Sequence, residues 1–434
     1  MRGHLTFGRD EFAYGLSVAL REIGESKRAT PKTARHFDNL YFSLFWWEHL
    51  YCLAEFLRCA GLKKGASAGP RINAGGFISF NPYPILSLCD SVCVGDAEGV
   101  ASSIETGHHQ SILRDNNSEC VYNVARPIEA ICHQTGDVTR VEIARGCKAK
   151  CSFCAVSHHK PYREVPIESI ERAVAQCKSK RISLFAPETT QHSAHSRIAE
   201  AAKWRNLCRA DTDVRLNAID KFTGGVPRVG IEGISYALRK SINKGYTDEF
   251  IIESVAKCIA EGRSGIHMYF ILDLPGECDN DWMALRSLFE RIGKIKGSDK
   301  FLIKPSPSVF MPTPHTPMEH HKINWDVDYG KKWSSFWGRG KDRNWAAMVA
   351  ERSRVFGPGQ RILSMISTRA GDEFAELESE MRRKKAYAFT GGRPKCADLK
   401  KMLKILEGYG GVEKYCGERH EGPWKKVTWK KDNA

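Results

Sequence analysis

The sequence has no apolar run long enough to cross a membrane. Its most apolar stretch, residues 41–61, is interrupted by Glu48, His49, Glu55 and Arg58, whereas a membrane-spanning helix needs about 20 predominantly apolar residues. We therefore expect a buried amphipathic helix over residues 41–60. The first residues also lack the apolar segment of a secretory signal peptide. These absences predict a cytoplasmic protein with no membrane partner.

Several common catalytic motifs are absent as well. The sequence shows no P-loop, no zinc-protease motif and no arrangement typical of Ser–His–Asp hydrolases. It does contain 15 cysteines. Without a secretory signal, these are better explained as reduced thiols and metal ligands than as disulfides. The cysteines therefore become the main candidates for chemistry.

The sequence has fewer acidic than basic residues, with 51 Asp and Glu against 66 Lys and Arg. From residue 320 onward there are 15 Asp and Glu and 25 Lys and Arg. The same region holds six of the ten tryptophans, among them Trp333, Trp337, Trp345, Trp424 and Trp429. Basic residues among aromatic ones favour nucleic-acid binding, because cations contact phosphates and rings stack on bases. The alternative is a helical cap with Trp333 and Trp337 in its core, followed by a solvated basic tail whose last ten residues are frayed.

Three cysteines stand in a CxxxCxxC spacing within RGCKAKCSFC (145–154), at Cys147, Cys151 and Cys154. Three thiolates this close can ligate three irons of a [4Fe-4S] cluster and leave the fourth iron open. Structural zinc sites use similar spacings, and His158 or His159 would then be the fourth ligand. The motif follows a predicted strand and precedes a predicted helix, which is where α/β barrels build active sites. This context favours the iron–sulfur interpretation.

The pattern along the chain predicts an α/β protein in three parts. Residues 1–130 predict a Rossmann-like α/β domain, although its start shows no obvious first strand. Residues 131–319 alternate strands and helices at a spacing that fits a partial (β/α)6 barrel better than a complete eight-stranded one. Residues 320–434 predict a basic, mainly helical extension.

Three further segments follow the cysteine motif in order: GIEGISYALRKSINKGYTDE (230–249), MYFILDLPGECDND (268–281) and KPSPSVFMPTPHTPME (304–319). Together they resemble the radical S-adenosylmethionine (radical SAM) superfamily, in particular its subfamily with an N-terminal cobalamin-binding-like domain. The resemblance implies a [4Fe-4S] cluster, SAM and an external electron donor. The front domain lacks the Asp-x-His-x-x-Gly pattern with which that subfamily ligates cobalamin, so we do not expect cobalamin to bind.

Five more residues become candidates for cofactor binding through this resemblance. Glu232 matches the acidic residue of the GIEG-type motif that contacts SAM; alternatively it is a surface carboxylate at a helix start. Glu188 lies where the family often has a Gly-Gly-Glu motif, but the two glycines are missing. Arg215 and Asn217 alternate with apolar neighbours on a strand predicted over 213–219, and could point into the barrel or contact solvent. Phe153 is the aromatic residue before the last cysteine of the motif.

The sequence therefore predicts a radical SAM enzyme. An adenosyl radical would abstract a hydrogen atom from a nucleic-acid base, or from an amino-acid adduct on one, in tRNA or DNA. Isomerisation and group insertion (an isomerase or a transferase) both fit. Two alternatives stay open: a radical SAM enzyme acting on a small metabolite or peptide, and a non-enzymatic protein that binds zinc and nucleic acid. No pattern indicates an oligomeric state.

Overall fold

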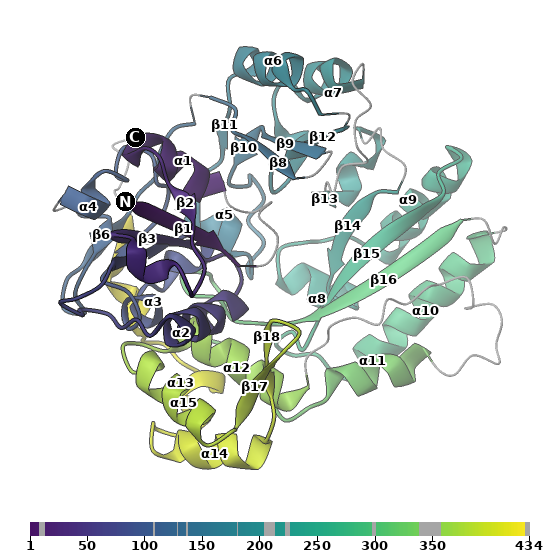
Figure 1. Cartoon of the computed structure of the whole chain (residues 1–434). Coiled ribbons are helices and arrows are strands. Elements are labelled where there is room, and N and C mark those ends of the chain that lie inside the picture. Colours follow the sequence, from purple (N-terminus) through teal and green to yellow (C-terminus); the bar gives the residue numbers. More distant parts are fainter. Residues whose placement is uncertain are drawn as a thin grey trace.

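The computed structural model describes residues 1–7, 14–106, 109–127, 129–135, 138–179, 181–203, 213–221, 226–296, 301–337 and 357–429. A Rossmann-like unit is followed by a parallel-stranded partial barrel and then by a mainly helical region that packs beneath both (Figure 1). Among the described helices, none combines the length and the apolar character that crossing a membrane requires.

The front domain is built on one sheet with the strand order β2-β1-β3-β4-β5-β6. Its strands are β1 (Arg2–Thr6), β2 (Lys27–Arg28), β3 (Asn39–Ser43), β4 (Arg71–Gly75), β5 (Ser91–Cys93) and the antiparallel edge β6 (Ile112–Leu113). Its helices are α1 (Tyr14–Ile23), α2 (Glu48–Ala60), α3 (Tyr83–Leu86) and α4 (Ser103–Thr106), with short 3-10 turns η2 (Ala34–His36) and η3 (Phe77–Phe80). The expectation that the start lacks a first strand is wrong, because β1 pairs in parallel with both β2 and β3.

The apolar stretch of residues 41–60 divides between a strand and a helix. β3 lies in the middle of the sheet, with Leu40 and Phe42 buried, and α2 begins only at Glu48. A strand buried on both faces of a parallel sheet is apolar throughout, so it cannot be told from a buried helix by periodicity. The predicted helix therefore began too early, although its end at Ala60 is confirmed by Gly61, whose φ of 64° closes the helix.

The partial (β/α)6 barrel predicted from the sequence is confirmed. Its parallel strands form two sheets, β9 with β12 and then β13-β14-β15-β16, and β8 adds to β9 in antiparallel fashion. The strands are β8 (Cys132–Thr135), β9 (Val138–Glu142), β12 (Arg181–Phe185), β13 (Asp213–Val214), β14 (Arg228–Glu232), β15 (Gly265–Leu272) and β16 (Leu302–Val309). The outer helices are α6 (Ile167–Gln176), α7 (His195–Lys203), α8 (Tyr236–Ser241), α9 (Asp248–Ala260) and α10 (Asp279–Lys296).

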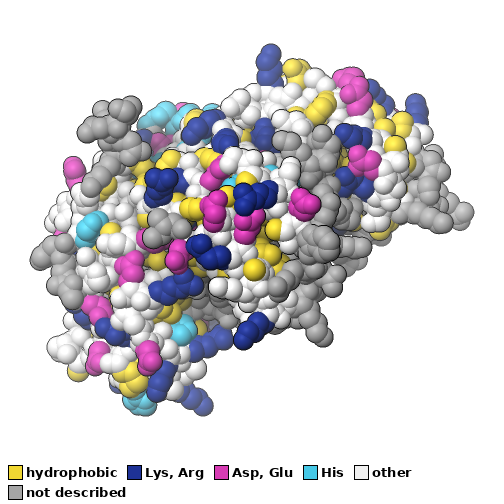
Figure 2. Space-filling model, turned by 90° about the horizontal axis from the view of Figure 1, so that it is seen from above, with side chains coloured by type: hydrophobic (Ala, Val, Ile, Leu, Met, Phe, Trp, Pro, Cys, Tyr) yellow, Lys and Arg dark blue, Asp and Glu magenta, His cyan; other side chains and the backbone are white. Residues whose placement is uncertain are grey.

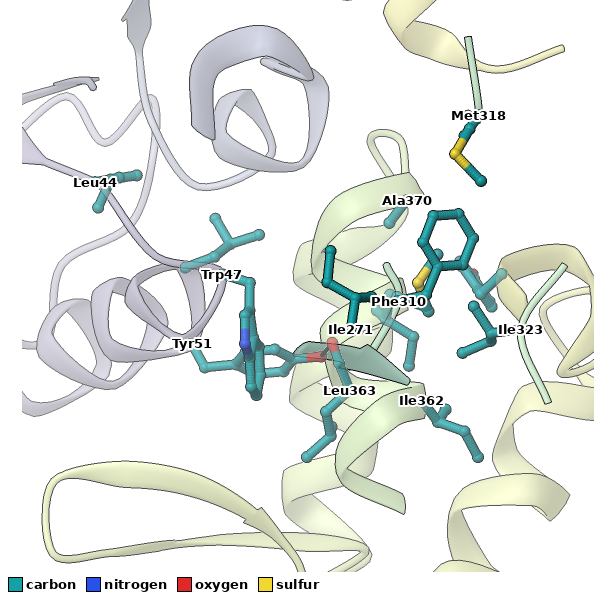
Figure 3. Close-up of a cluster of buried hydrophobic side chains, with 14 of the residues drawn as sticks. Leu44, Trp47, Tyr51, Ile271, Phe310, Met318, Ile323, Ile362, Leu363 and Ala370 are labelled. Atoms are coloured by element: carbon teal, nitrogen blue, oxygen red, sulfur yellow. Dashed lines mark hydrogen bonds between the residues drawn. The ribbon is translucent and has the colours of Figure 1, made fainter. Parts of the chain in front are cut away.

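The C-terminal region completes the core of both preceding parts. It contains α11 (Tyr329–Trp337), α12 (Pro358–Arg369), α13 (Phe374–Arg383), β17 (Tyr387–Thr390), β18 (Arg393–Cys396), α14 (Leu399–Glu407), α15 (Glu413–Cys416), η7 (Pro423–Lys426) and β19 (Val427–Trp429). Ile362 and Leu363 of α12 belong to the same hydrophobic cluster as Tyr51 of α2 and Phe310 after β16 (Figure 3). The Tyr51 hydroxyl donates to the Leu363 carbonyl oxygen at 3.0 Å. One hydrophobic cluster thus joins all three parts of the chain.

The end of the described chain is ordered rather than frayed. β19 pairs in parallel with β7 (Cys120–Tyr122) of the front domain, with Val427 opposite Cys120. Trp424 is completely buried, and its indole nitrogen donates to Glu319 at 3.0 Å. Residues 425–429 of the predicted loose tail therefore belong to the fold.

The tryptophans expected to stack on bases are mostly part of the core. Trp333 packs against Trp282 of α10 with ring centroids 6.3 Å apart, and Trp337 packs against Phe289 at 4.9 Å. Trp345 lies outside the described residues. On the face shown in Figure 2, Lys and Arg side chains lie among Asp and Glu side chains instead of forming one basic patch. The core alternative is therefore correct for Trp333 and Trp337.

Candidate active site

The cysteine motif forms a loop closed at its base by two short antiparallel strands. β10 (Ala144–Arg145) pairs with β11 (Arg163–Glu164), and α5 (Ala155–His159) begins directly after Cys154. Gly146 opens the loop with φ 71°, and a Cβ atom there would lie 2.4 Å from the Pro161 carbonyl oxygen. A residue with a side chain would be both strained and blocked at this position. The loop therefore depends on glycine just before its first cysteine.

The loop is also held by the connection between α8 and α9. The Ser152 amide donates to the Ile242 carbonyl oxygen at 3.1 Å, and the Asn243 side-chain amide donates to the Lys150 carbonyl oxygen at 2.9 Å. Asn243 itself has a positive φ of 58°, which Asn tolerates better than most residues. These bonds fix the cysteine loop against the carboxyl-terminal end of β14.

Each of the three sulfurs has nitrogen donors around it. The Gln191 side chain donates to Cys147 Sγ at 3.4 Å, and the Arg215 guanidinium donates to Cys151 Sγ at 3.8 Å. Burial raises the pKa of the Cys154 thiol, and the backbone amides of Ser157 and Val156 oppose this effect. Donors and positive charge both favour thiolates over thiols. The set is therefore suited to binding a metal cluster.

The two histidines after the loop are engaged elsewhere. His158 Nε2 lies 3.1 Å from the Cys151 carbonyl oxygen, and His159 Nε2 lies 2.6 Å from that of Pro314. Zinc could reach either ring only through Nδ1. Both Nε2 atoms therefore face backbone carbonyl oxygens rather than the cysteine sulfurs.

Glu232 lies at the carboxyl-terminal end of β14, and the SAM contact expected for it stays a prediction. It has a positive φ of 72°, and its side chain is mostly buried with Lys244 Nζ 3.5 Å from Oε1. Burial raises the pKa of Glu232, while the charges of Lys244 and Arg215 oppose that rise. A Cβ atom at Gly230 would lie 2.1 Å from Oε1, so glycine leaves room for this carboxylate. Sequence reasoning did not single out Lys244, although it lies within the segment 230–249.

The strand predicted over residues 213–219 is largely wrong. β13 ends at Val214, and a 3-10 turn, η5 (Leu216–Lys221), follows. Arg215 therefore points toward Cys151, with its guanidinium 5.8 Å from the centre of the Tyr246 ring. Asn217 is exposed on the turn and does not share this direction. Alternation with apolar neighbours describes a strand only where the chain is extended.

Glu188 and Phe153 have mainly local contacts. Glu188 Oε1 accepts the backbone amide of Thr190 at 2.9 Å and its hydroxyl at 2.5 Å, which caps the short turn η4 (Thr189–Gln191). Phe153 is partly buried against the main hydrophobic cluster. The structure therefore gives Glu188 a positioning role at this turn, and the SAM contact expected for it stays a prediction.

A buried group of charges, which sequence reasoning missed, joins the loop to the front domain. Arg145 donates two hydrogen bonds of 2.9 Å to Glu142 and pairs with Glu98 at 2.6 Å. Nearby, Asp96 pairs with Arg163 at 2.7 Å and with Lys160 at 3.1 Å. Burial raises the pKa of Asp96, but the surrounding cations hold it well below its usual range. The only available hint was the position of Asp96 just after a predicted strand.

A cavity of about 370 Å³ lies beside these charges, between the front sheet and the barrel. Its front wall includes Ser43, Gly75 and Gly76 at the carboxyl-terminal ends of β3 and β4. Glu142 and Arg145 form part of the opposite wall. Ligands of open parallel sheets bind at this edge. The cavity is therefore a second candidate binding site, next to the cysteine loop.

Comparisons with known proteins agree with this geometry. The family model of the radical SAM superfamily matches residues 141–289. The uncharacterized protein MJ0966 of Methanocaldococcus jannaschii is 20% identical over 311 residues, covering 66% of this chain and 69% of that protein. This chain is similar in structure to the radical SAM methyltransferase TsrM from Kitasatospora setae, which was solved with cobalamin and a [4Fe-4S] cluster bound. The match has a TM-score of 0.53 and 16% sequence identity, and it covers 74% of this chain and 77% of TsrM. The cobalamin-dependent radical SAM enzyme OxsB matches with a TM-score of 0.51 and 12% identity over 92% of this chain and 64% of OxsB.

The expectation that cobalamin does not bind is contradicted by these matches, because both solved enzymes are cobalamin proteins. The expectation was based only on the absence of the Asp-x-His-x-x-Gly pattern, which would supply one ligand to cobalt. The sequence gives no direct sign of the cavity between the front sheet and the barrel. The cavity wall is partly apolar, since Phe45, Trp46 and Phe77 line it beside the Gly75–Gly76 backbone. No histidine is among the described residues that line it.

Proposed function

We propose, because residues 141–289 match the radical SAM superfamily, that Cys147, Cys151 and Cys154 hold a [4Fe-4S] cluster at which SAM is bound and cleaved. The observation that carries the proposal is the arrangement of the three cysteines on one loop, two of whose sulfurs accept side-chain N–H donors from neighbouring barrel segments. When bound, the cluster would pass an electron from an external donor to SAM, giving methionine and a 5′-deoxyadenosyl radical.

The side chains around the loop have separate roles in this proposal. Arg215 and Lys244 bring positive charge to the side of Cys151, where a thiolate-ligated cluster carries negative charge. Glu232 offers a buried carboxylate to the amino group of SAM, and Lys244 keeps that carboxylate in place until the ligand arrives. The outer barrel helices and the C-terminal region exclude water from the radical.

The test is to reconstitute the protein anaerobically, add SAM and a strong reductant, and measure bound iron and 5′-deoxyadenosine. We expect both in wild type and neither in Cys151→Ala. Cys59→Ala is the matched control, because Cys59 is exposed on α2, away from the loop. Zinc in place of iron, with no deoxyadenosine, would refute the enzyme and favour the zinc- and nucleic-acid-binding alternative.

We propose further that the cavity beside the front sheet holds cobalamin and that the reaction is a group transfer rather than an isomerisation. The cavity opens between the sheet edge and the cysteine loop, and the fold is shared with a cobalamin-binding methyltransferase. Hydroxocobalamin should bind with a change in its visible spectrum, and Ser43→Trp, which fills the cavity, should weaken binding. An unchanged affinity in this variant would place the ligand elsewhere.

A nucleic-acid substrate also stays a prediction, now supported by charge rather than by exposed aromatic rings. Gel-shift titrations with tRNA and duplex DNA at two salt concentrations would test it. Retained affinity at the higher salt, with raised deoxyadenosine formation, would support it. Weak binding that disappears with salt would favour the small-metabolite or peptide alternative.

A further inference from the structure

Gln191 connects the backbone amide of Lys148 with the sulfur of Cys147, the first cysteine of the motif. Its side-chain Oε1 accepts the Lys148 backbone amide at 2.8 Å, and its Nε2 lies 3.4 Å from Cys147 Sγ. A backbone amide can only donate, so Oε1 must face Lys148. The NH₂ group therefore faces the sulfur, and the orientation of the amide is settled by its partners.

The turn that carries Gln191 is held from several directions. Glu188 caps its start, and His192 Nε2 lies 3.0 Å from the Val165 carbonyl oxygen. The Lys148 ammonium group donates to the Gln191 carbonyl oxygen at 3.0 Å. These contacts hold the backbone of the turn, and they therefore fix the position from which the Gln191 side chain reaches Cys147.

The donors to the three sulfurs differ in charge. Cys151 faces the guanidinium of Arg215, and Cys154 faces backbone amides at the start of α5. Cys147 receives its side-chain donor from a neutral amide. Hydrogen bonds to cluster sulfurs raise the reduction potential, because they stabilise the extra negative charge of the reduced state. A neutral donor can be removed or replaced without changing the charge on the cationic side of the loop.

We propose that Gln191 is a positioning residue that raises the reduction potential of the cluster by donating a hydrogen bond to Cys147. The inference rests on the proposed function and deepens it. Reduction here adds one electron from the external donor to the cluster, and no bond forms or breaks at Gln191. Its N–H would stabilise the added negative charge on the Cys147 sulfur and so favour reduction of a bound cluster.

The test is an EPR-monitored redox titration of the reconstituted protein without SAM. Gln191→Glu keeps the acceptor for the Lys148 amide but removes the donor and adds negative charge. It should lower the reduced fraction at a fixed potential about tenfold, equivalent to ~59 mV for one electron. Gln191→Leu should shift the potential in the same direction by less. Gln176→Glu is the matched control, since Gln176 is exposed at the end of α6.

The outcomes separate this inference from the proposed function. Unchanged potentials in both Gln191 variants, at full iron content, would overturn the role of Gln191 and leave the cluster proposal standing. Loss of iron from both variants would show that Gln191 retains the cluster rather than tunes it, and would also overturn the inference. Wild-type protein without an iron–sulfur signal would overturn the proposed function itself.

Discussion

The indole nitrogen of Trp429 donates a hydrogen bond of 2.9 Å to the carbonyl oxygen of His159. His159 ends α5, the helix after the cysteine loop, and Trp429 ends β19. The same indole lies edge-on to His315 with ring centroids 4.6 Å apart and stacks on Tyr122 at 5.3 Å. One side chain therefore connects the front domain, the cysteine loop and the segment after β16.

We expect Trp429→Ala to lower the free energy of unfolding by about 2–3 kcal/mol, because it removes a large, partly buried ring. Trp429→Phe keeps most of the packing and loses the hydrogen bond, at a cost of about 1 kcal/mol. Chemical denaturation followed by circular dichroism measures both. Equal losses in the two variants would show that the hydrogen bond, and not the ring, provides the stabilisation.

Acid should destabilise this same region. Burial lowers the pKa of His159 to about 3 and that of His315 to about 4, against about 6.5 in the unfolded chain. The folded state therefore resists protonation, and stability should be lost as the pH falls from about 6.5 toward 4. His159→Phe should be less sensitive to pH in unfolding experiments over this range. His36→Gln, at an exposed position, should behave like wild type.

Loss of the buried Arg145–Glu142 ion pair should lower the free energy of unfolding far more than loss of the exposed Arg197–Glu171 pair. Arg145 and Arg197 each donate two hydrogen bonds to a glutamate, Glu142 and Glu171, but only the first pair is buried. Arg145→Met should cost about 3–5 kcal/mol, because it leaves Glu142 buried without its partner. Arg197→Met should lower the free energy of unfolding far less, because solvent screens the exposed pair. Thermal unfolding of the two variants compares them directly, and similar losses would contradict this prediction.

Gly146→Ala should prevent formation of the cysteine loop while leaving the remaining fold intact. The positive φ and the nearby Pro161 carbonyl oxygen exclude a Cβ atom. Iron content after reconstitution should fall to the level of Cys151→Ala, and far-ultraviolet circular dichroism should be unchanged. Gly65→Ala, where φ is 70° but the space is open, serves as the control for backbone strain alone. Normal iron content in Gly146→Ala would refute the argument.

Glu232→Gln should weaken SAM binding without affecting cluster loading. The variant keeps the size of the side chain and removes the charge that would meet the amino group of SAM. We expect at least a tenfold rise in KM for SAM, with unchanged iron. Glu253→Gln, on the exposed side of α9, should leave KM as in wild type. A normal KM in Glu232→Gln would move the SAM contact to another residue.

Local signals predicted the elements that local interactions define. The helix α9 shows such signals in its own sequence, because Thr247 caps it and acidic residues occupy its first turn. The strand at residues 39–43 was missed because it lies between two other strands and is buried, so its residues do not alternate between apolar and polar. Gln191 could not be predicted, since its function depends on a residue far away in sequence. The tryptophans of α11 were assigned to the core only as an alternative, because composition does not reveal which ring faces α10.

The pairing of β19 with β7 bears on how the protein is made. β7 and the cysteine loop leave the ribosome long before residues 427–429 are synthesised. Until then, α5 lacks its contact with Trp429 and the front domain lacks its last neighbouring strand. The contacts around α5 would therefore be completed only near the end of synthesis, and proteins cut short before residue 427 would lack them.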